Sequence, residues 1–274
     1  MKRSLLAAIA LACAAPAFAL TLAAVAPPST ISDKTFASVL KGSWRDPANS
    51  ARDRYRHPRQ TLQFFGLRQD QTVIEITPGT GWYSEVLAPL LKDHGSYIAA
   101  VQSSGSFDTL KRKFDADSAH YGKARLVTFD PKAPTFGPDA SADALLTFRN
   151  VHNWVMADNA KAMFQGFYQV LKPGGTLGVV DHRGKPGETV EQIKSSGYLP
   201  TEYVIKLATD AGFTLVGQSE INANHRDTKD YPQGVWTLPP TYKLGAKDKA
   251  KYQAIGESDR MTLRFIKPVA VAKD

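Results

Sequence analysis

Cysteine is almost missing from this chain. The only one among 274 residues is Cys13, which lies in an apolar block near the N-terminus. If that block is removed, no thiol remains to form a disulfide. A disulfide-stapled scaffold is therefore excluded, and the fold must be stabilised by packing. The length is sufficient for one large α/β domain with a full hydrophobic core.

Long hydrophobic runs are also missing, apart from residues 4–15, which are too few to span a bilayer. A short positive region, Met1-Lys2-Arg3, precedes this run, and Ala17-Phe18-Ala19 follows as an A-x-A cleavage pattern. We expect residues 1–19 to be a secretory signal peptide cleaved after Ala19, which predicts a periplasmic or secreted protein. The alternatives are an uncleaved anchor helix and a lipid attached at Cys13. We expect no transmembrane helix in the rest of the chain.

Positive charge is in excess, but it is not concentrated. The formal net charge is +8, and Lys2 and Arg3 carry two of these charges, which leaves +6 from Leu20 onward. Basic residues form only short clusters such as Lys111-Arg112-Lys113 and no stripe interleaved with aromatic residues. This pattern argues against nucleic-acid binding and indicates a solvated surface with weak attraction to anionic surfaces.

Strand and helix patterns alternate through the middle of the chain. Apolar, β-branched runs predict strands at 73–77, 97–102, 124–130, 144–148 and 176–181, and amphipathic periodicity predicts helices at 83–91, 107–121 and 159–171. Residues 131–141 are expected to form a loop. This alternation predicts a parallel, doubly wound sheet with helices on both faces.

The regions before and after this alternation differ from it. We expect a linker at 20–35 and an N-terminal helical cap at 36–70, in which Pro58 begins a new helix. Toward the C-terminus we expect a helix at 202–211, a strand at 213–220, a polar stretch at 221–258 and a last strand at 261–267. That last strand would be an antiparallel seventh strand. The predicted fold is α/β, a doubly wound, mostly parallel seven-stranded sheet over residues 71–268.

Three motifs follow one another in this region. The first is Glu75-Ile76-Thr77-Pro78-Gly79-Thr80-Gly81-Trp82, where a strand ends in a turn of small residues before a helix. Such a turn lets the backbone approach a nucleotide-like ligand, although glycines also occur in ordinary turns. The second is Lys172-Pro173-Gly174-Gly175, which ends a helix before the fifth strand. The third, residues 148–154, follows the fourth strand, beyond whose carboxyl end open α/β sheets bind ligands.

In this order the motifs resemble those of class I S-adenosylmethionine-dependent methyltransferases. In that family an acidic residue begins a run of alternating small residues; here Thr77 takes the first glycine position, and Gly79 and Gly81 keep the other two. The resemblance covers about residues 72–267. Residues 78–83, together with Arg56-His57-Pro58 and Phe64-Phe65-Gly66, are also similar to a group of exported bacterial methyltransferases. The resemblance implies a Rossmann-like methyltransferase fold and S-adenosylmethionine as the cofactor.

The resemblance also implies a set of cofactor-binding residues. Glu75 would orient the loop and the amino-acid end of the cofactor. Gln102 stands where the family has an acidic residue on the ribose hydroxyls, and an amide makes no charge-assisted bond there. Asp130 would meet the adenine amino group. The full set is Glu75, Thr77, Gly79, Gly81, Trp82, Gln102, Asp130, Phe148 and Asn150.

Several of these residues also have purely structural interpretations. Glu75 could serve only the start of the following helix, and Asp130 only the turn before Pro131. Trp82 is as well explained by packing as by stacking on a ligand.

Methyl transfer is a displacement at a sulfonium, so aligning donor and acceptor can supply most of the catalysis. A base is needed only where the acceptor must lose a proton. The candidates for this role are His152, Asp181 and His182, with a structural role as the alternative for both histidines. Tyr55, His57, Tyr83 and Arg183 are candidates to close the acceptor pocket. No sequence cluster of His, Asp and Glu has metal-ligand spacing, so we expect no metal site.

These observations predict an enzyme that transfers a methyl group from S-adenosylmethionine to a small-molecule or cell-envelope acceptor. The alternative is a non-catalytic, methyltransferase-like ligand-binding protein of the periplasm. Gln102 and the export signal favour that alternative, because S-adenosylmethionine is a charged product of the cytoplasm. A nicotinamide-dependent oxidoreductase shares the glycine loop, but it does not explain residues 172–175 or the last strand.

Overall fold

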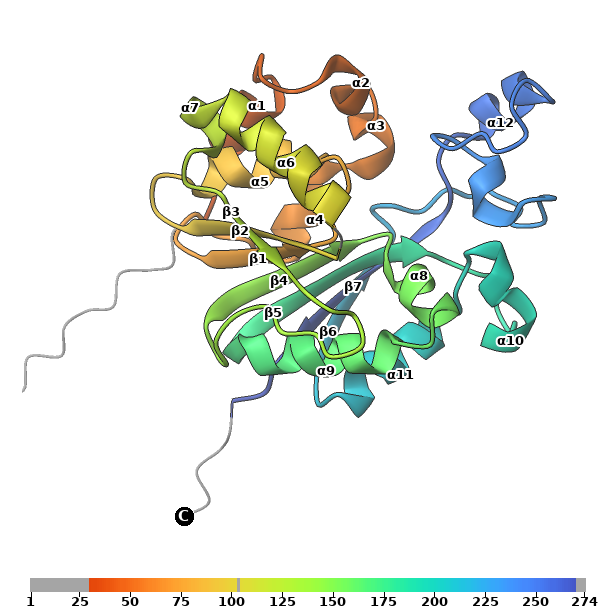
Figure 1. Cartoon of the computed structure of the whole chain (residues 1–274). Coiled ribbons are helices and arrows are strands. Elements are labelled where there is room, and N and C mark those ends of the chain that lie inside the picture. Colours follow the sequence, from red (N-terminus) through yellow and green to blue (C-terminus); the bar gives the residue numbers. More distant parts are fainter. Residues whose placement is uncertain (1–29, 103, 270–274) are drawn as a thin grey trace, which may run out of the picture.

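The computed structural model describes residues 30–102 and 104–269. The expected signal peptide and the first part of the expected linker lie outside the described residues. Within them, seven strands form one sheet in the order β3-β2-β1-β4-β5-β7-β6 (Figure 1). The strands are β1 Thr72–Ile76, β2 Ser96–Val101, β3 Arg125–Thr128, β4 Ala142–Phe148, β5 Leu171–His182, β6 Thr214–Ser219 and β7 Arg260–Ile266.

The directions of the strands confirm the predicted topology. β1 is parallel to both β2 and β4, and β4 is parallel to β5. β7 lies between β5 and β6 and is antiparallel to both. The strand predicted at 261–267 is therefore the antiparallel strand of the sheet. Because β7 runs against its neighbours, its first residues lie at the edge of the sheet where β4 and β5 end.

Burial explains why these segments form strands. β1 lies in the middle of the sheet, and four of its five residues are buried because both of its faces are covered. β6 lies at the edge, where exposed and half-buried residues alternate. Continuous burial is typical of a strand in a parallel sheet covered on both faces. Alternating burial is typical of a strand with one face exposed to solvent.

Helices cover both faces of the sheet (Figure 1). Helices α1, α4 and α5 pack on one face through a cluster that includes Phe36, Leu62 and Leu87; α9 and α11 pack on the other through Phe164, Phe167 and Val204. The helices are α1 Asp33–Leu40, α2 Pro47–Ser50, α3 Asp53–Arg56, α4 Pro58–Phe64, α5 Ser84–Leu91, α6 Ser104–Ala116, α7 Ser118–Tyr121, α8 Val151–Met156, α9 Ala160–Val170, α10 Val190–Ile193, α11 Thr201–Asp210 and α12 Lys249–Ile255.

Helices α1 to α4 occupy the region expected to form the cap. The indole nitrogen of Trp82, beside the glycine loop, donates to the carbonyl oxygen of Asn49 at 2.8 Å. In return, the indole nitrogen of Trp44 donates to the carbonyl oxygen of Glu85 at 2.9 Å. The cap therefore holds the start of α5 and packs directly on the domain that follows it.

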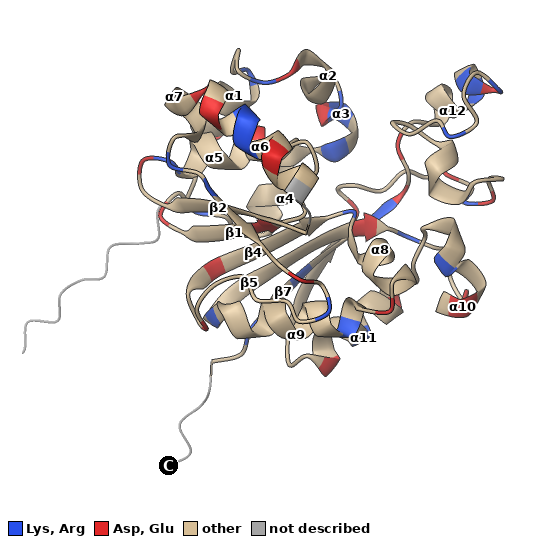
Figure 2. Cartoon of the chain, viewed as in Figure 1, with Lys and Arg blue, Asp and Glu red and all other residues tan. Residues whose placement is uncertain are grey.

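Some element predictions need correction. The helix predicted at 107–121 is two helices, because the side chain of Asp117 accepts a hydrogen bond from the backbone nitrogen of His120 and begins α7. Residues 151–156 form α8, where the sequence indicated only the end of a strand, and α12 lies within the predicted polar stretch. None of the described helices has the length and apolar character needed to cross a membrane. Basic and acidic residues are interspersed along the helices, strands and loops (Figure 2).

Candidate functional site

The glycine loop after β1 is held in an unusual backbone conformation. Thr77, Gly79 and Gly81 all have positive φ, at 51°, 63° and 89°. Such angles are natural for glycine and costly for threonine, and strain of this kind concentrates at ligand sites. Gly79 is exposed, and no atom lies within 4 Å of the position that a Cβ would take. A Cβ at Gly81 would instead approach Leu110 to 3.0 Å. Gly79 therefore leaves open space for a ligand, whereas Gly81 allows close packing.

Glu75 lies beneath this loop. Its side chain is only 2% exposed and accepts a hydrogen bond of 2.6 Å from the hydroxyl of Tyr97. The hydroxyl of Ser84, the first residue of α5, lies 3.5 Å from the same carboxylate oxygen. Burial raises the pKa of Glu75 to about 7, opposed by these hydrogen bonds and by the charge of Arg56. Glu75 therefore contacts β2 and the first residue of α5, and a carboxylate packed so deeply acts on a ligand only through the helix start that follows the loop.

Asn150, which lies between β4 and α8, supports the same loop. Its side-chain nitrogen donates to the carbonyl oxygen of Ile76 at 3.0 Å and lies 3.4 Å from that of Thr77. The side chain is 7% exposed. The position predicted to line the ligand therefore fixes the backbone that faces it.

The other predicted cofactor residues divide into exposed and buried ones. Gln102 and Asp130 are exposed just beyond β2 and β3, which are parallel neighbours, so both lie at the same edge of the sheet as the glycine loop. The ring of Phe148 stacks on that of Tyr83, with centroids 3.6 Å apart. Trp82 is 5% exposed, and the guanidinium of Arg56 lies 4.6 Å from its ring centroid. Trp82 is thus a packing residue here, and stacking on a ligand is not open to it.

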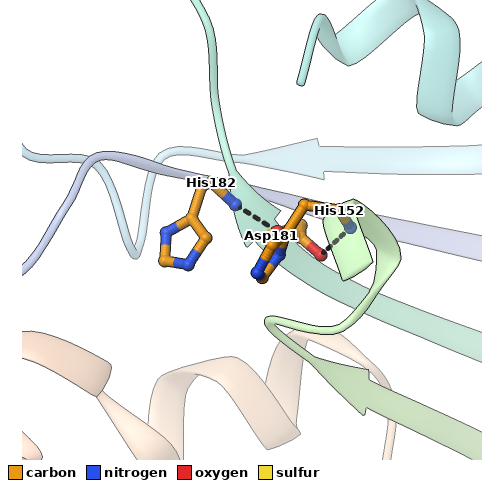
Figure 3. A group of neighbouring side chains, drawn as sticks. All are labelled: His152, Asp181 and His182. Carbon is orange, nitrogen blue, oxygen red and sulfur yellow. Dashed lines mark hydrogen bonds and ion pairs between the residues drawn. The ribbon is translucent and has the colours of Figure 1, made fainter. Parts of the chain in front are cut away.

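The structure brings together the three predicted catalytic candidates (Figure 3). His152 lies in the first turn of α8, and Asp181 and His182 end β5. Nδ1 of His152 lies 2.8 Å from Oδ1 of Asp181, which also accepts the backbone nitrogen of His182 at 2.7 Å. Burial, followed by the charges of His152 and Arg149, lowers the pKa of His182 well below its ordinary value. Asp181 therefore fixes the His152 ring as it would fix a general base, and His182 is a neutral neighbour.

The same three residues form a group whose ligand atoms lie within 4.8 Å of one another. The sequence prediction overlooked this group because His152 is far from the other two residues along the chain. Asp181 accepts hydrogen bonds on both of its oxygens, since Oδ2 accepts the backbone nitrogen of Val151 at 2.6 Å. Nδ1 of His182 contacts the hydroxyl of Ser258 at 2.5 Å. The carboxylate oxygens and ring nitrogens named above already take part in hydrogen bonds, and positively charged arginines lie nearby. The group is therefore better suited to a proton-transfer network than to binding a metal cation.

The sequence analysis missed a cluster of arginines at the same edge. Arg56 and Arg260 are buried, and Arg149 follows Phe148 with a φ of 64°. All three influence the pKa of His182 through their charge, and Glu257 interacts electrostatically with Arg56 and Arg149. In the sequence, only the charged run at 52–59 indicated this cluster, because Arg149 follows β4 and Arg260 begins β7. Of the residues expected to close an acceptor pocket, Tyr55 and His57 lie close to this cluster, whereas Arg183 pairs with Glu220 and Asp259 elsewhere.

Comparison with known proteins shows a similarity to methyltransferases. Residues 73–175 match the family described as a methyltransferase domain. The chain is 27% identical over 135 residues to the ubiquinone/menaquinone biosynthesis C-methyltransferase UbiE of Marinomonas sp. (strain MWYL1), which covers 49% of this chain and 52% of that protein. It is 28% identical over 123 residues to the protein of the same name from Enterobacter sp. (strain 638), covering 45% and 47%. The chain thus spans about half the length of the curated relatives that it matches.

Solved structures share the fold. A SAM-dependent methyltransferase from Aquifex aeolicus aligns with a TM-score of 0.56 at 15% identity and covers 84% of this chain and 97% of its own. The [4+2]-cyclase SpnF aligns with a TM-score of 0.55 at 18% identity and covers 84% of both chains. The predicted resemblance to class I S-adenosylmethionine-dependent methyltransferases is confirmed, and S-adenosylmethionine is the cofactor that this resemblance implies.

Proposed function

We propose that this chain, whose residues 73–175 match a methyltransferase domain, transfers a methyl group from S-adenosylmethionine to a small-molecule or cell-envelope acceptor. The observation that carries the proposal is the open space at Gly79, in a strained loop at the edge where β1, β2 and β3 end. In open α/β sheets ligands bind beyond these ends. The backbone amides of Gly79 and Thr80 would hold the amino-acid end of the cofactor, since those of Thr77 and Gly81 already donate to Ala100 and Pro78. Gln102 and Asp130 would hold its ribose and adenine. The cofactor, when bound, supplies the sulfonium methyl group.

The chain itself would supply alignment and proton transfer. Phe148 and Asn150 hold the end of β4 against the glycine loop, which sets the direction from which an acceptor can approach. His152, fixed by Asp181, is the group best placed to take a proton where the acceptor must lose one. Alignment alone is sufficient for an acceptor that is already nucleophilic.

Calorimetric titration of the purified protein with S-adenosylmethionine, S-adenosylhomocysteine and NAD tests the proposal. We expect the first two to bind and NAD not to bind. Binding of NAD alone would indicate an oxidoreductase, and silence for all three ligands would refute the cofactor assignment.

One observation favours a second candidate, a ligand-binding protein without methyl transfer. Gln102 is exposed at the ribose position but lacks the charge of the usual acid. The structural neighbour SpnF, named a [4+2]-cyclase, indicates that this fold does not by itself specify methyl transfer. The two candidates separate on turnover: with methyl-labelled S-adenosylmethionine and an envelope extract as acceptor, transfer of label supports the enzyme, and binding without transfer supports the alternative.

The same proposal includes export, because residues 1–19 have the charge, apolar block and A-x-A pattern of a signal peptide. Fractionation of expressing cells, followed by N-terminal sequencing, tests it. We expect a periplasmic product beginning at Leu20; a cytoplasmic product beginning at Met1 would contradict export. Export would require the cofactor to be available outside the cytoplasm.

A further inference from the structure

A wide pocket lies at the start of β7, where Arg260 is the register partner of His182. Its volume is about 790 Å³, within the range of small-molecule sites. It is lined by segments far apart in the sequence: α3 and its end, the stretch after β6, α12 and the start of β7. The lining residues used below are Arg54, His57, Asn222, Arg226, Glu257 and Arg260.

The charge of this pocket is unbalanced. Its only acidic lining residue is Glu257, against three arginines. Glu257 is already paired with Arg52 at 2.6 Å, with Arg56 at 3.3 Å and with Arg260 at 3.1 Å. We call Arg52, Arg56, Arg149 and Arg260 the arginine wall. Besides Glu257, Asp181 interacts electrostatically with Arg149, and Glu75 with Arg56. These carboxylates are fewer than the four guanidinium groups, so the wall keeps an excess of positive charge.

Two members of the wall have a buried nitrogen without a hydrogen-bond partner, Nη2 of Arg52 and Nε of Arg149, and of these two only Arg149 lacks an ion pair with Glu257. No hydrogen bond or ion pair of the Arg149 side chain is found among the described residues. Burial lowers the pKa of Arg149 to about 10 and that of Arg56 to about 9, with repulsion from other arginines adding to the effect. A buried donor without a partner is costly, and an anion would supply the missing acceptor.

A second, narrow pocket, called the slot below, lies between Arg149 and the end of β4. It is lined by Arg56, Arg149, Tyr83, Phe148 and Val180, and it shares Asn222 and Arg260 with the wide pocket. Its volume of about 10 Å³ is that of about one water molecule, so it admits no more than a single ligand atom, such as one anionic oxygen. The body of a ligand would therefore lie in the wide pocket, with one atom in the slot reaching toward Phe148 at the end of β4.

We propose that the methyl acceptor is a small organic anion, carboxylate or phosphate, whose charged group binds at the arginine wall and contacts Arg149. This inference rests on the proposed methyltransferase function, and it adds the chemical class of the acceptor. A wall of guanidinium groups favours planar, bidentate recognition of such anions.

The test uses benzoate, phenyl phosphate and the neutral benzamide, each titrated into the purified protein and monitored by calorimetry. We expect benzoate or phenyl phosphate to bind and benzamide to bind at least about tenfold more weakly, because a charge-assisted hydrogen bond is lost. Which of the two anions binds more tightly distinguishes a carboxylate from a phosphate acceptor. Arg149→Gln should weaken anion binding by about tenfold, and Arg149→Lys should restore part of it.

The matched control is Arg112→Gln, which removes the same charge from the exposed surface of α6. We expect it to leave anion binding unchanged. Equal weakening by Arg112→Gln and Arg149→Gln would overturn the proposal, as would benzamide binding like benzoate or no binding of either anion.

S-adenosylmethionine is titrated into the same variants, so that failure of the methyltransferase proposal can be told apart from failure of the acceptor-site proposal. Loss of its binding in Arg149→Gln to the same extent as benzoate would assign this arginine to the cofactor carboxylate and overturn the acceptor site. Anion binding without any binding of S-adenosylmethionine would refute the methyltransferase and leave the anion site standing.

Discussion

The hydroxyl of Tyr97 donates a 2.6 Å hydrogen bond to the carboxylate of Glu75, from the strand next to it in the sheet. Both side chains are buried below the glycine loop. This contact stabilises the ionised carboxylate, but burial has the larger effect, so the pKa of Glu75 stays raised at about 7. The protonation state of one buried side chain is therefore linked to Ser84, the first residue of the helix that follows the glycine loop.

We expect this carboxylate to make stability depend on pH. Its folded pKa of about 7 lies above its ordinary value of 4.5, so the folded state binds more protons between the two. The free energy of unfolding should fall as pH rises through this window, by about 3 kcal/mol from this group alone. Urea denaturation of the protein and of Glu75→Gln at pH 5 and pH 8 measures it, and the variant should lack this decline.

Tyr97→Phe is the companion variant. Removing the hydroxyl removes a contact that lowers the pKa of Glu75, so the decline in stability should extend to higher pH. Parallel pH profiles for the protein, Glu75→Gln and Tyr97→Phe would show that the burial of Glu75 has no such effect.

Gly79→Val should abolish binding of S-adenosylmethionine. The substitution places a branched side chain in the open space of the loop, at a φ of 63°, and costs about 1–2 kcal/mol in backbone strain. Gly245→Val is a matched control, because Gly245 is exposed, has the same φ of 63° and has no atom within 4 Å of its Cβ position. Calorimetry should show binding in the control only; equal binding by both variants would move the cofactor away from this loop.

Asp181→Ala should destabilise the protein by about 2–4 kcal/mol, because it leaves buried donors from Val151, His152 and His182 without acceptors. Asp210→Ala removes an exposed carboxylate paired with Lys206 and should change stability by less than about 0.5 kcal/mol. Denaturant unfolding compares the two. Similar effects would mean that the network around Asp181 contributes little.

Gln102→Asp should tighten binding of S-adenosylmethionine by about tenfold, since a carboxylate makes charge-assisted bonds to ribose hydroxyls. Gln102→Asn keeps the amide with a shorter side chain and should bring no gain. Titration of both variants decides the ribose assignment, which weaker binding by Gln102→Asp would contradict.

The sequence predicted the fold to within a few residues for most strands, because the signals are local. The run at 72–76 is buried except for Thr72. Gly174 has the left-handed backbone expected there, with a φ of 79°, but it lies within β5, which begins at Leu171, and not before that strand. The antiparallel direction of β7 followed from its late position after a long excursion. Helix α8 was missed because six residues are too few to establish a helical period.

The site was less predictable because its contacts are long-range. Nothing in the sequence near Glu75 indicates that Tyr97 and Ser84 enclose its carboxylate, and nothing near Trp82 indicates that Asn49 takes its indole hydrogen. The arginine wall combines residues 52 and 56 with residues 149 and 260 around one carboxylate. No regular spacing in the sequence reveals such a cluster, because its members come together only when distant segments of the chain pack against one another.

The direction of β7 determines which part of the chain supplies residues to the ligand edge of the sheet. Because this strand enters the sheet where the others leave it, it delivers Arg260 and the preceding Glu257 to the ligand edge from beyond the matched residues 73–175. The glycine loop lies within the matched residues 73–175, and every lining residue of the wide pocket lies outside them. Of the arginine wall proposed to bind the acceptor, only Arg149 comes from the matched residues, so proteins that share residues 73–175 can differ in most of the groups that would contact an acceptor.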